Sequence, residues 1–191
     1  MKSDFFALLA RMKYIERWSL MRNITRENIA EHSFFVALLS HALACIRRDV
    51  LGLPCDPERA AALALFHDAS EIFTGDLPTP IKYFNPEMRA AYAKIEEHAA
   101  ARLLRTLPGA LAPSYAALLA MPEDYQPLVR AADKLAAYIK CIEERTSGNT
   151  EFSQAEQSTR AALEALAMPE VTYFLAHFIP SFDLTLDELE R

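Results

Sequence analysis

Two adjacent residues, His67 and Asp68, carry the strongest chemical signal in the sequence, within the segment FHDASEIFTGDLPTP. An imidazole nitrogen and a carboxylate from neighbouring residues can hold one divalent metal ion only if other parts of the fold supply further ligands. Two candidates stand at suitable places, His32 in NIAEHSFF and Asp133 in RAADKLAAY. Because a metal held by two imidazoles and two carboxylates keeps room for water, these residues predict a hydrolytic metal centre.

A helix expected over residues 57–73 would bring Glu71 to this centre. His67 and Glu71 are four residues apart and would share a helix face, whereas Asp68 would lie about a third of a turn round the axis. Glu71 would then project into the metal cavity as a proton donor or acceptor. The alternative is that His67 packs beneath the core while both acids are solvated. We favour the functional interpretation because the helix is otherwise apolar (AALALF) and its polar residues gather at one end.

The two distant ligands also have plainer interpretations. His32 lies in the first turn of an expected helix, where a histidine more often satisfies only the helix start. Asp133 lies among small apolar neighbours and is expected to be buried, which is costly for a carboxylate unless it is paired or bound to a metal. An ion pair with Arg130 or Lys134 is the alternative for this residue. The remaining histidines are expected to be structural or exposed: His41, His98 and His177.

Residues suited to a phosphorylated sugar stand in two other places. Arg17 and Trp18 are expected to end the first helix. An arginine grips a phosphate through its planar fork, and an indole can flank a sugar or a base. The plainer interpretation is a helix-end arginine and a core tryptophan. Asp76 and Thr79 belong to the GDLPTP loop directly after the predicted metal helix, where they would be placed to hold a substrate, although turn chemistry alone explains such residues.

Apolar residues recur at helical spacing along nearly every long segment, and the sequence has no strand-type alternation of useful length. It therefore predicts an all-α, single-domain helical bundle over residues 1–191. Asn28 with Glu31 forms a capping-box pattern at one helix start, and Asp56 followed by Pro57 marks another. The expected helices cover about 4–17, 29–48, 57–73, 81–84, 86–107, 111–120, 127–145, 151–167 and 170–178.

The composition, with 52% hydrophobic and 24% charged residues, is ordinary for a soluble globular domain of 191 residues. A formal net charge of −6 argues against polymeric nucleic acid as the main partner, but not against a small phosphorylated ligand. Four scattered glycines exclude Rossmann and P-loop nucleotide sites. We expect no segment to reach the length of a membrane span. Three cysteines without a CxxC pair, and a start without signal-peptide features, indicate a reduced, cytoplasmic protein.

Four pieces in this order (RW, EHS, HDASE followed by GDLPTP, and a late AAD) resemble the HD-domain superfamily of metal-dependent phosphohydrolases. The segments RWSLMRNITRENIAEHS, FHDASEIFTGDLPTPIKYFN and FIPSFDLTLDEL are similar to those of the bacterial HD-domain 5′-deoxynucleotidases, and the resemblance spans essentially the whole chain. It implies an all-helical homodimer that hydrolyses deoxyribonucleoside 5′-monophosphates with one divalent cation, cobalt being a good activator. Mixed imidazole and carboxylate ligation would suit Co, Mn, Fe or Zn.

Carried over by motif, the resemblance also implies functions for individual residues. The metal ligands would be His32, His67, Asp68 and Asp133. The catalytic residues would be Glu71, Asp68 and Arg17. The substrate-binding residues would be Arg17, Trp18, His32, Asp68, Asp76, Leu77, Pro78, Thr79 and Asp133.

As a hypothesis, Arg17 would neutralise charge on the phosphate while Glu71 delivers a proton to the departing 5′ oxygen. Asp76 and Thr79 would orient the sugar, and Trp18 would lie against its 2′ carbon. Two alternatives remain at this stage. One is another HD phosphohydrolase, acting on cyclic nucleotides or nucleotide polyphosphates, and the other is a non-catalytic helical module that holds a metal for structure.

Overall fold

The computed structural model describes residues 2–82 and 84–190, without the side chains of Thr79 and Pro80. The regular elements of this described part are all helices, and an isolated bridge between Glu16 and Asn28 is its β-type pairing, so the all-α prediction is confirmed. The elements are α1 (Phe5–Leu9), η1 (Ala10–Tyr14), α2 (Ile29–Cys45), η2 (Ile46–Val50), α3 (Pro57–Leu65), α4 (Glu71–Thr74), α5 (Thr79–Lys82), α6 (Pro86–Leu104), α7 (Ala112–Leu119), α8 (Gln126–Thr146), η3 (Thr150–Phe152), α9 (Ser153–Glu164), α10 (Pro169–His177), η4 (Ile179–Asp183) and α11 (Leu186–Leu189).

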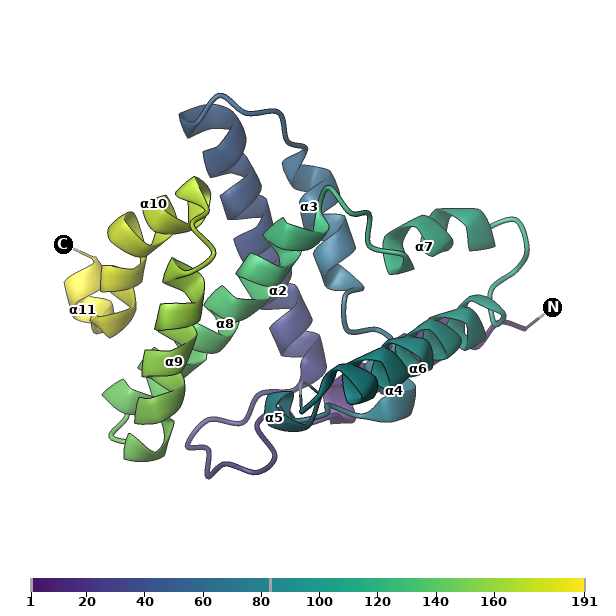
Figure 1. Cartoon of the computed structure of the whole chain (residues 1–191), viewed down its shortest axis with the longest axis horizontal. Helices are drawn as coiled ribbons and strands as arrows, with labels where there is room; N and C mark the ends of the chain where they lie inside the picture. Colours follow the sequence, from purple (N-terminus) through teal and green to yellow (C-terminus); the bar gives the residue numbers. More distant parts are fainter. Residues whose placement is uncertain (1, 83, 191) are drawn as a thin grey trace.

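Helix α2 runs through the centre of the molecule and packs against α3 and α8 (Figure 1). Its inward side chains meet those of α3 and α8 in the main hydrophobic core, and burying each leucine or isoleucine there stabilises the fold by roughly 2 kcal/mol. This core includes Val36, Leu43, Leu63, Leu135 and Ile139. Helices α9 and α10 cover its far side.

The apolar character of α2 corrects one expectation. Among the described residues, the segment Ile29–Val50 is long and apolar enough to cross a membrane, with a mean hydropathy of 1.6 over an 18-residue window. Of that window 56% is buried inside the molecule, as expected for the core helix of a bundle.

A second, smaller apolar cluster lies where α1 meets α6, and it consists of Phe5, Ala69, Leu103 and Leu107. Ala69 follows α3, whose own residues Leu63 and Ala64 belong to the main core. The turn of residues 66–70 is therefore held between two apolar clusters. That packing fixes the position of the two residues in this turn that the sequence singled out.

The starts of α2 and α3 are where the sequence predicts them. The Asn28 side chain accepts hydrogen bonds from the backbone N–H groups of Ala30 and Glu31, and Glu31 completes the capping box. Asp56 caps α3, with Pro57 at its first position. The cap at Asn28 places His32 in the first turn of α2, where its side chain is buried.

The first helical segment, α1 with η1, ends at Tyr14, before the predicted end at Arg17. After η1 the backbone becomes extended at Ile15, and Arg17 donates its N–H to the carbonyl of Glu27 at 2.9 Å. The N–H of Ile29 donates in turn to the carbonyl of Ile15 at 3.0 Å. This pairing with the segment before α2 replaces the helical bonds. Arg17 and Trp18 therefore lie in a loop and do not end a helix.

The predicted helix over residues 57–73 is also interrupted. A continuous helix would offer the carbonyl of Ala64 to the N–H of Asp68, but this carbonyl instead accepts from the ring nitrogen Nδ1 of His67 at 2.7 Å. The backbone of 66–70 forms turns with shorter-range bonds, such as Glu71 N–H to Asp68 carbonyl at 3.0 Å. His67 and Glu71 thus do not share one helix face. Residues 66–70 form the turn that separates α3 from α4.

The loop between η1 and α2 is anchored to α8 by Lys140 and Glu144, which form a buried ion pair with each other on that helix. Lys140 donates to the backbone carbonyl of Thr25 in the loop. The Glu144 carboxylate also accepts from the backbone N–H groups of Ile24 at 2.9 Å and Thr25 at 3.1 Å, and from the Asn149 amide at 2.8 Å. Burial alone would raise the pKa of Glu144. The ammonium group of Lys140 and these donors outweigh burial and lower that pKa to about 2.

Replacing this carboxylate with a neutral amide tests the anchor. We expect Glu144→Gln to lower the free energy of unfolding by about 3 kcal/mol at pH 7, because it leaves the Lys140 charge buried without its partner. The folded-state pKa lies below the unfolded one, so the stabilisation is fully present above about pH 4.5 and is lost as the pH falls through about 2. Urea unfolding of the unaltered protein and of Glu144→Gln between pH 7 and pH 2.5 measures the difference between their free energies of unfolding, which should become smaller as the pH falls.

The matched control is Glu164→Gln, which removes the other i, i+4 ion pair, Arg160–Glu164, whose side chains are both more than half exposed. This variant should change the free energy of unfolding by less than about 0.5 kcal/mol. Equal effects of the two substitutions would contradict an anchoring function for Glu144.

Candidate metal and phosphate site

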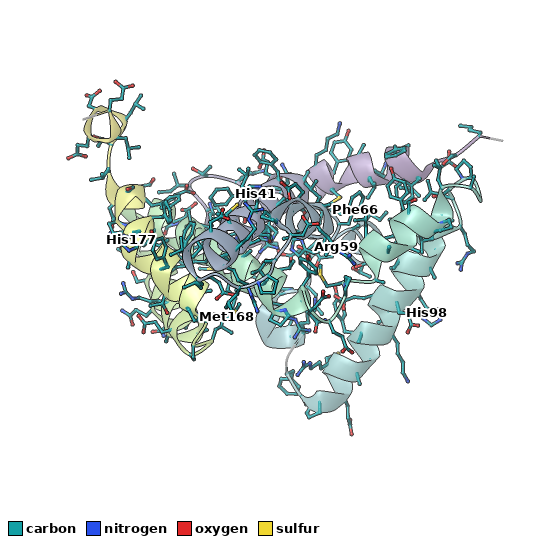
Figure 2. All side chains as sticks on the ribbon, turned by 90° about the horizontal axis from the view of Figure 1, so that it is seen from above. His41, Arg59, Phe66, His98, Met168 and His177 are labelled. Atoms are coloured by element: carbon teal, nitrogen blue, oxygen red, sulfur yellow. The ribbon has the colours of Figure 1, made fainter. Side chains whose placement is uncertain are left out.

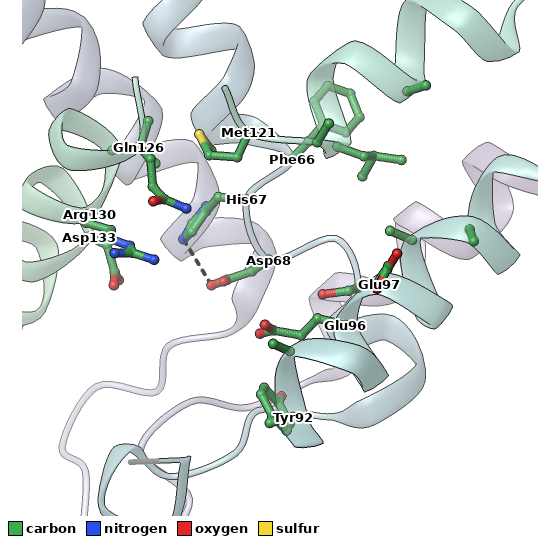
Figure 3. Close-up of a pocket in the computed structure, with 18 of the residues that line it drawn as sticks. Phe66, His67, Asp68, Tyr92, Glu96, Glu97, Met121, Gln126, Arg130 and Asp133 are labelled. Carbon is green, nitrogen blue, oxygen red and sulfur yellow. Dashed lines mark ion pairs between the residues drawn. The ribbon is translucent and has the colours of Figure 1, made fainter. Parts of the chain in front are cut away.

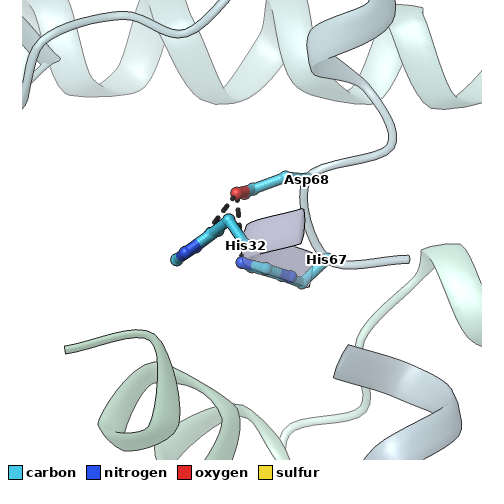
Figure 4. A group of neighbouring side chains, drawn as sticks. All are labelled: His32, His67 and Asp68. Carbon is cyan, nitrogen blue, oxygen red and sulfur yellow. Dashed lines mark ion pairs between the residues drawn. The ribbon is translucent and has the colours of Figure 1, made fainter. Parts of the chain in front are cut away.

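Donor atoms from three separate segments meet at the ends of α2 and α3. The Nε2 atom of His32 lies 3.0 Å from an oxygen of Asp133 on α8 and 3.6 Å from an oxygen of Asp68. That oxygen of Asp68 lies 3.1 Å from Nε2 of His67 (Figure 4). One ligand atom each from His32, His67 and Asp68 can be chosen so that all lie within 4.8 Å of one another. The structure thus brings together the four residues that the sequence predicted as ligands.

The surroundings of the two imidazoles fit a metal ion. Both Nε2 atoms are buried and lack a hydrogen-bond partner within the described part of the chain. The Nδ1 atom of His67 lies 2.7 Å from the carbonyl of Ala64, which can accept only if Nδ1 carries the proton. The lone pair of Nε2 in His67 then faces the cluster, as metal ligation requires. Two imidazoles and two carboxylates suit Zn, Co, Mn or Fe.

Asp133 differs from its predicted environment. Its side chain is 42% exposed, so the expectation that it is buried is wrong. The carboxylate faces a cleft between α6, α7 and α8 rather than the core, and its ion-pair contacts in the structure are with His32 and Arg17. The alternative of an ion pair with Arg130 or Lys134 therefore does not account for its position.

Arg17 reaches the cluster from the loop before α2. Its guanidinium lies 3.5 Å from Asp68, 4.0 Å from Asp133 and 3.2 Å from Glu27, and its side chain is 13% exposed. Burial would lower the pKa of Arg17, but Asp133 and Asp68 outweigh burial and raise it. A permanently charged fork therefore stands beside the candidate ligands, where it can meet the oxygens of an anion.

Glu71 is a buried carboxyl group, 5% exposed, whose Oε2 atom has no hydrogen-bond partner among the described residues. Burial and the negative charges of Asp68 and Asp76 raise the pKa of Glu71 to about 9, against the opposing effect of Lys82 and Arg17. In the metal-free site the protonated form of Glu71 is therefore favoured at neutral pH. A protonated carboxyl beside a charged site can act as a general acid.

The predicted sugar-binding residues lie at the edge of this cluster. Trp18 has a left-handed backbone with φ +56°, and its ring packs against Phe152 with the centroids 5.3 Å apart. Asp76, Leu77 and Pro78 are half-buried in the loop that begins at Gly75 and follows α4. Burial raises the pKa of Asp76, while Arg17 lowers it. The side chain of Thr79, also predicted to hold substrate, lies outside the described residues.

Glu27 is a further residue of the site, and its sequence context did not predict it. Its carboxylate accepts from Nε of Arg17 at 3.2 Å and from the indole N–H of Trp18 at 2.9 Å, and its other oxygen lies 3.6 Å from Nδ1 of His32. Burial would raise the pKa of Glu27, but His32 and Arg17 lower it. One signal was available in the sequence, since Glu27 is an acid directly before the cap Asn28 and close in sequence to the candidate ligand His32.

A cleft of about 800 Å³ opens beside the cluster. One wall holds His67, Asp68 and Asp133, and the opposite wall is the face of α6 that carries Tyr92 and Glu96 (Figure 3). Its volume is in the range of small-molecule sites, so a nucleotide-sized ligand can reach the ligand cluster from solvent.

The other three histidines lie away from this cluster. His41, His98 and His177 are exposed on α2, α6 and α10 (Figure 2). The prediction that they are structural or exposed is confirmed. They leave two imidazoles, those of His32 and His67, for the candidate site.

Comparison with known sequences gives a consistent result over the whole chain. A sequence model of the YfbR-like 5′-deoxynucleotidases matches residues 4–182. A 5′-deoxynucleotidase of Vibrio cholerae is 50% identical over 191 residues, covering 98% of each chain. The 5′-deoxynucleotidase YfbR of Salmonella paratyphi B is 47% identical over 193 residues, covering 100% of this chain and 97% of the relative.

Solved structures show the same fold. An HD-domain phosphohydrolase of Listeria innocua superposes with a TM-score of 0.81 at 25% identity, covering 94% of this chain and 88% of the other. A cyanophage S-2L HD phosphohydrolase, solved with dA and one catalytic Zn²⁺ ion, superposes with a TM-score of 0.66 at 23% identity, covering 94% and 96%.

Removing single donors tests the metal assignment. We expect Asp68→Ala and His67→Ala each to weaken binding of Zn²⁺ or Co²⁺ by more than about 100-fold, because each removes a ligand that no neighbour replaces. Competition titration against a chromophoric chelator measures the affinity, and far-UV circular dichroism shows whether the helices are retained. The control is His98→Ala, an exposed histidine, which should bind metal as the unaltered protein does. Unchanged affinity in Asp68→Ala would contradict the assignment.

Proposed function

Because this chain belongs to the YfbR-like 5′-deoxynucleotidase family, we propose that its metal and phosphate site performs the reaction named for its relatives. The protein is a phosphohydrolase that converts deoxyribonucleoside 5′-monophosphates to deoxyribonucleosides and phosphate. The observation that carries this function is the meeting of four ligand side chains with Arg17 and the buried carboxyl group of Glu71.

The chemistry divides between a metal and the chain. A divalent cation held by His32, His67, Asp68 and Asp133 supplies Lewis-acid polarisation and activation of water when it is bound. Arg17 neutralises charge on the non-bridging phosphate oxygens through its fork of N–H donors. Glu71 delivers a proton to the departing 5′ oxygen.

The sugar contacts come from the loop before α2 and the loop after α4. Asp76 accepts a hydrogen bond from the 3′ hydroxyl, and the half-buried Leu77 and Pro78 shape the loop around the deoxyribose. Trp18 lies against the 2′ carbon, so that an added 2′ hydroxyl is disfavoured by crowding. Arg17 belongs to the first loop, and its charge acts on Asp76 in the second loop.

We also propose a cellular location, a metal and an oligomeric state for the enzyme. The whole chain, residues 1–191, acts as one HD domain in the cytoplasm with one divalent cation, cobalt being an effective activator in vitro and Mn, Fe or Zn being other candidates. It works as a homodimer, and the exposed side chains of Phe34 and Leu38, one turn apart on α2, support an apolar contact. Sedimentation of the metal-loaded enzyme as a monomer at micromolar concentration would contradict the dimer.

A substrate panel tests the activity. We expect protein stripped of metal and reloaded with Co²⁺ or Mn²⁺ to release phosphate from deoxyribonucleoside 5′-monophosphates, and to act poorly on their ribose and 3′-phosphate counterparts. A cyclic nucleotide and a phosphodiester reporter complete the panel. Cleavage of the diesters with silent monoesters would place the enzyme among phosphodiesterases. Silence with every metal, although metal binds, would indicate a non-catalytic module.

Sugar selection has its own test. We expect Trp18→Ala to lower the ratio of kcat/KM for deoxyribose over ribose substrates by about 10-fold or more, because crowding at the 2′ position discriminates on the order of 10²-fold. Turnover of the deoxynucleotides should fall less than this ratio. Trp18→Phe keeps an aromatic surface and should retain most of the preference. An unchanged ratio in Trp18→Ala would exclude this contact as the source of selection.

A further inference from the structure

The two carboxylate oxygens of Glu27 face two different parts of the site. Oε2 accepts from Nε of Arg17 at 3.2 Å and from the indole N–H of Trp18 at 2.9 Å. Oε1 lies 3.6 Å from Nδ1 of His32. The side chain is 15% exposed, so these contacts are largely shielded from water.

From this geometry we propose that Glu27 is a positioning residue that connects the metal ligand His32 to the phosphate contact Arg17 and the sugar contact Trp18. The inference rests on the proposed function for the roles of those three residues. Glu27 itself contacts neither the metal nor the substrate. It orients His32, Arg17 and Trp18, which do.

His32 needs such a partner for a chemical reason. A neutral imidazole that ligates through Nε2 carries its proton on Nδ1, and an acceptor on that side fixes the tautomer and the ring orientation. His67 uses the carbonyl of Ala64 in this way. The fully buried Nδ1 of His32 has no partner within hydrogen-bond distance in the described chain, and Glu27 is the acidic group placed within ion-pair distance of it.

The other oxygen holds the substrate side of the site. Trp18 adopts a left-handed backbone conformation, which a bulky residue keeps only where its surroundings impose it. The indole is held between the ring of Phe152 and the carboxylate of Glu27. The same oxygen fixes Nε of Arg17, which leaves the other guanidinium nitrogens directed at Asp68 and Asp133.

A comparison with Glu144 separates this function from plain loop anchoring. Glu144 binds backbone N–H groups of the same loop, at Ile24 and Thr25, and so holds the course of the chain. Glu27 binds side chains, and all three belong to the candidate site. Its removal should therefore change metal affinity and indole placement more than global stability.

An amide substitution separates the two oxygens. In Glu27→Gln the amide oxygen can still accept from Arg17 and Trp18, but the amide NH₂ then faces Nδ1 of His32 and cannot accept its proton. We expect affinity for Zn²⁺ to fall 10- to 100-fold, as for other partners of metal-bound histidines. Trp18 is the only tryptophan in the chain, so acrylamide quenching of its fluorescence reports on this one side chain, and quenching should stay unchanged.

In Glu27→Ala both readouts should change, with weaker Zn²⁺ binding and stronger quenching of the freed indole. The matched control is Glu151→Gln, which alters an acid bound to Arg22 in the same loop, and it should change neither readout. Thermal unfolding of the metal-free proteins shows whether each variant is folded.

Either of two results would overturn the proposal. Wild-type Zn²⁺ affinity in folded Glu27→Gln would remove the connection to His32, and wild-type quenching in folded Glu27→Ala would remove the connection to Trp18. If Glu27→Ala does not fold, the isosteric Glu27→Gln still tests the connection to His32. Glu27→Asp, whose side chain is shorter, then tests the connection to Trp18. Neither readout uses nucleotide turnover, so failure of the proposed function in the substrate panel would be seen separately.

Discussion

His32 places both of its ring nitrogens in the interior, where α2, α8 and the turn after α3 meet, and the rest of the site is arranged around that fact. A buried imidazole without partners is costly, and both nitrogens of His32 lack a hydrogen bond in the described structure. Acidic groups stand on both sides of the ring, Asp133 and Asp68 near Nε2 and Glu27 near Nδ1. In the absence of metal, Asp133 and Glu27 outweigh burial and raise the pKa of His32 to about 9.

The same crowding of acids explains why Glu71 differs from its neighbours. Asp68 keeps a low pKa because His67, His32 and Arg17 outweigh the cost of its burial. Glu71 forms no ion pair with a described residue, and the charges of Asp68 and Asp76 add to the effect of burial. In the metal-free site Glu71 therefore favours its protonated form, whereas Asp68 is charged. The two carboxyl groups differ because their neighbours differ.

The sequence predicted those features of fold and site that depend on local chemistry. Apolar periodicity and the cap at Asn28 were sufficient to place His32 in the first turn of a helix. The break after Leu65 was not predictable from periodicity, because it arises when the side chain of His67 takes the carbonyl of Ala64. Glu27 was missed for a related reason. Its importance depends on a fold that returns Arg17 and Trp18 to it across an intervening loop.

That return also explains how a loop can be part of a precise site. The bridge between Glu16 and Asn28, with the bond from Arg17 N–H to the Glu27 carbonyl, closes the segment into a short backbone loop whose end is the cap of α2. Glu144 fixes the middle of this loop to α8, the helix that carries Asp133. Arg17 is thus connected by short, bonded paths to the helices of two candidate ligands, His32 and Asp133. Misplacement of a catalytic group by about 1 Å can lower a reaction rate on the order of 10²-fold. A loop that contributes such a group must therefore be held rigidly, and these bonds hold the loop that carries Arg17.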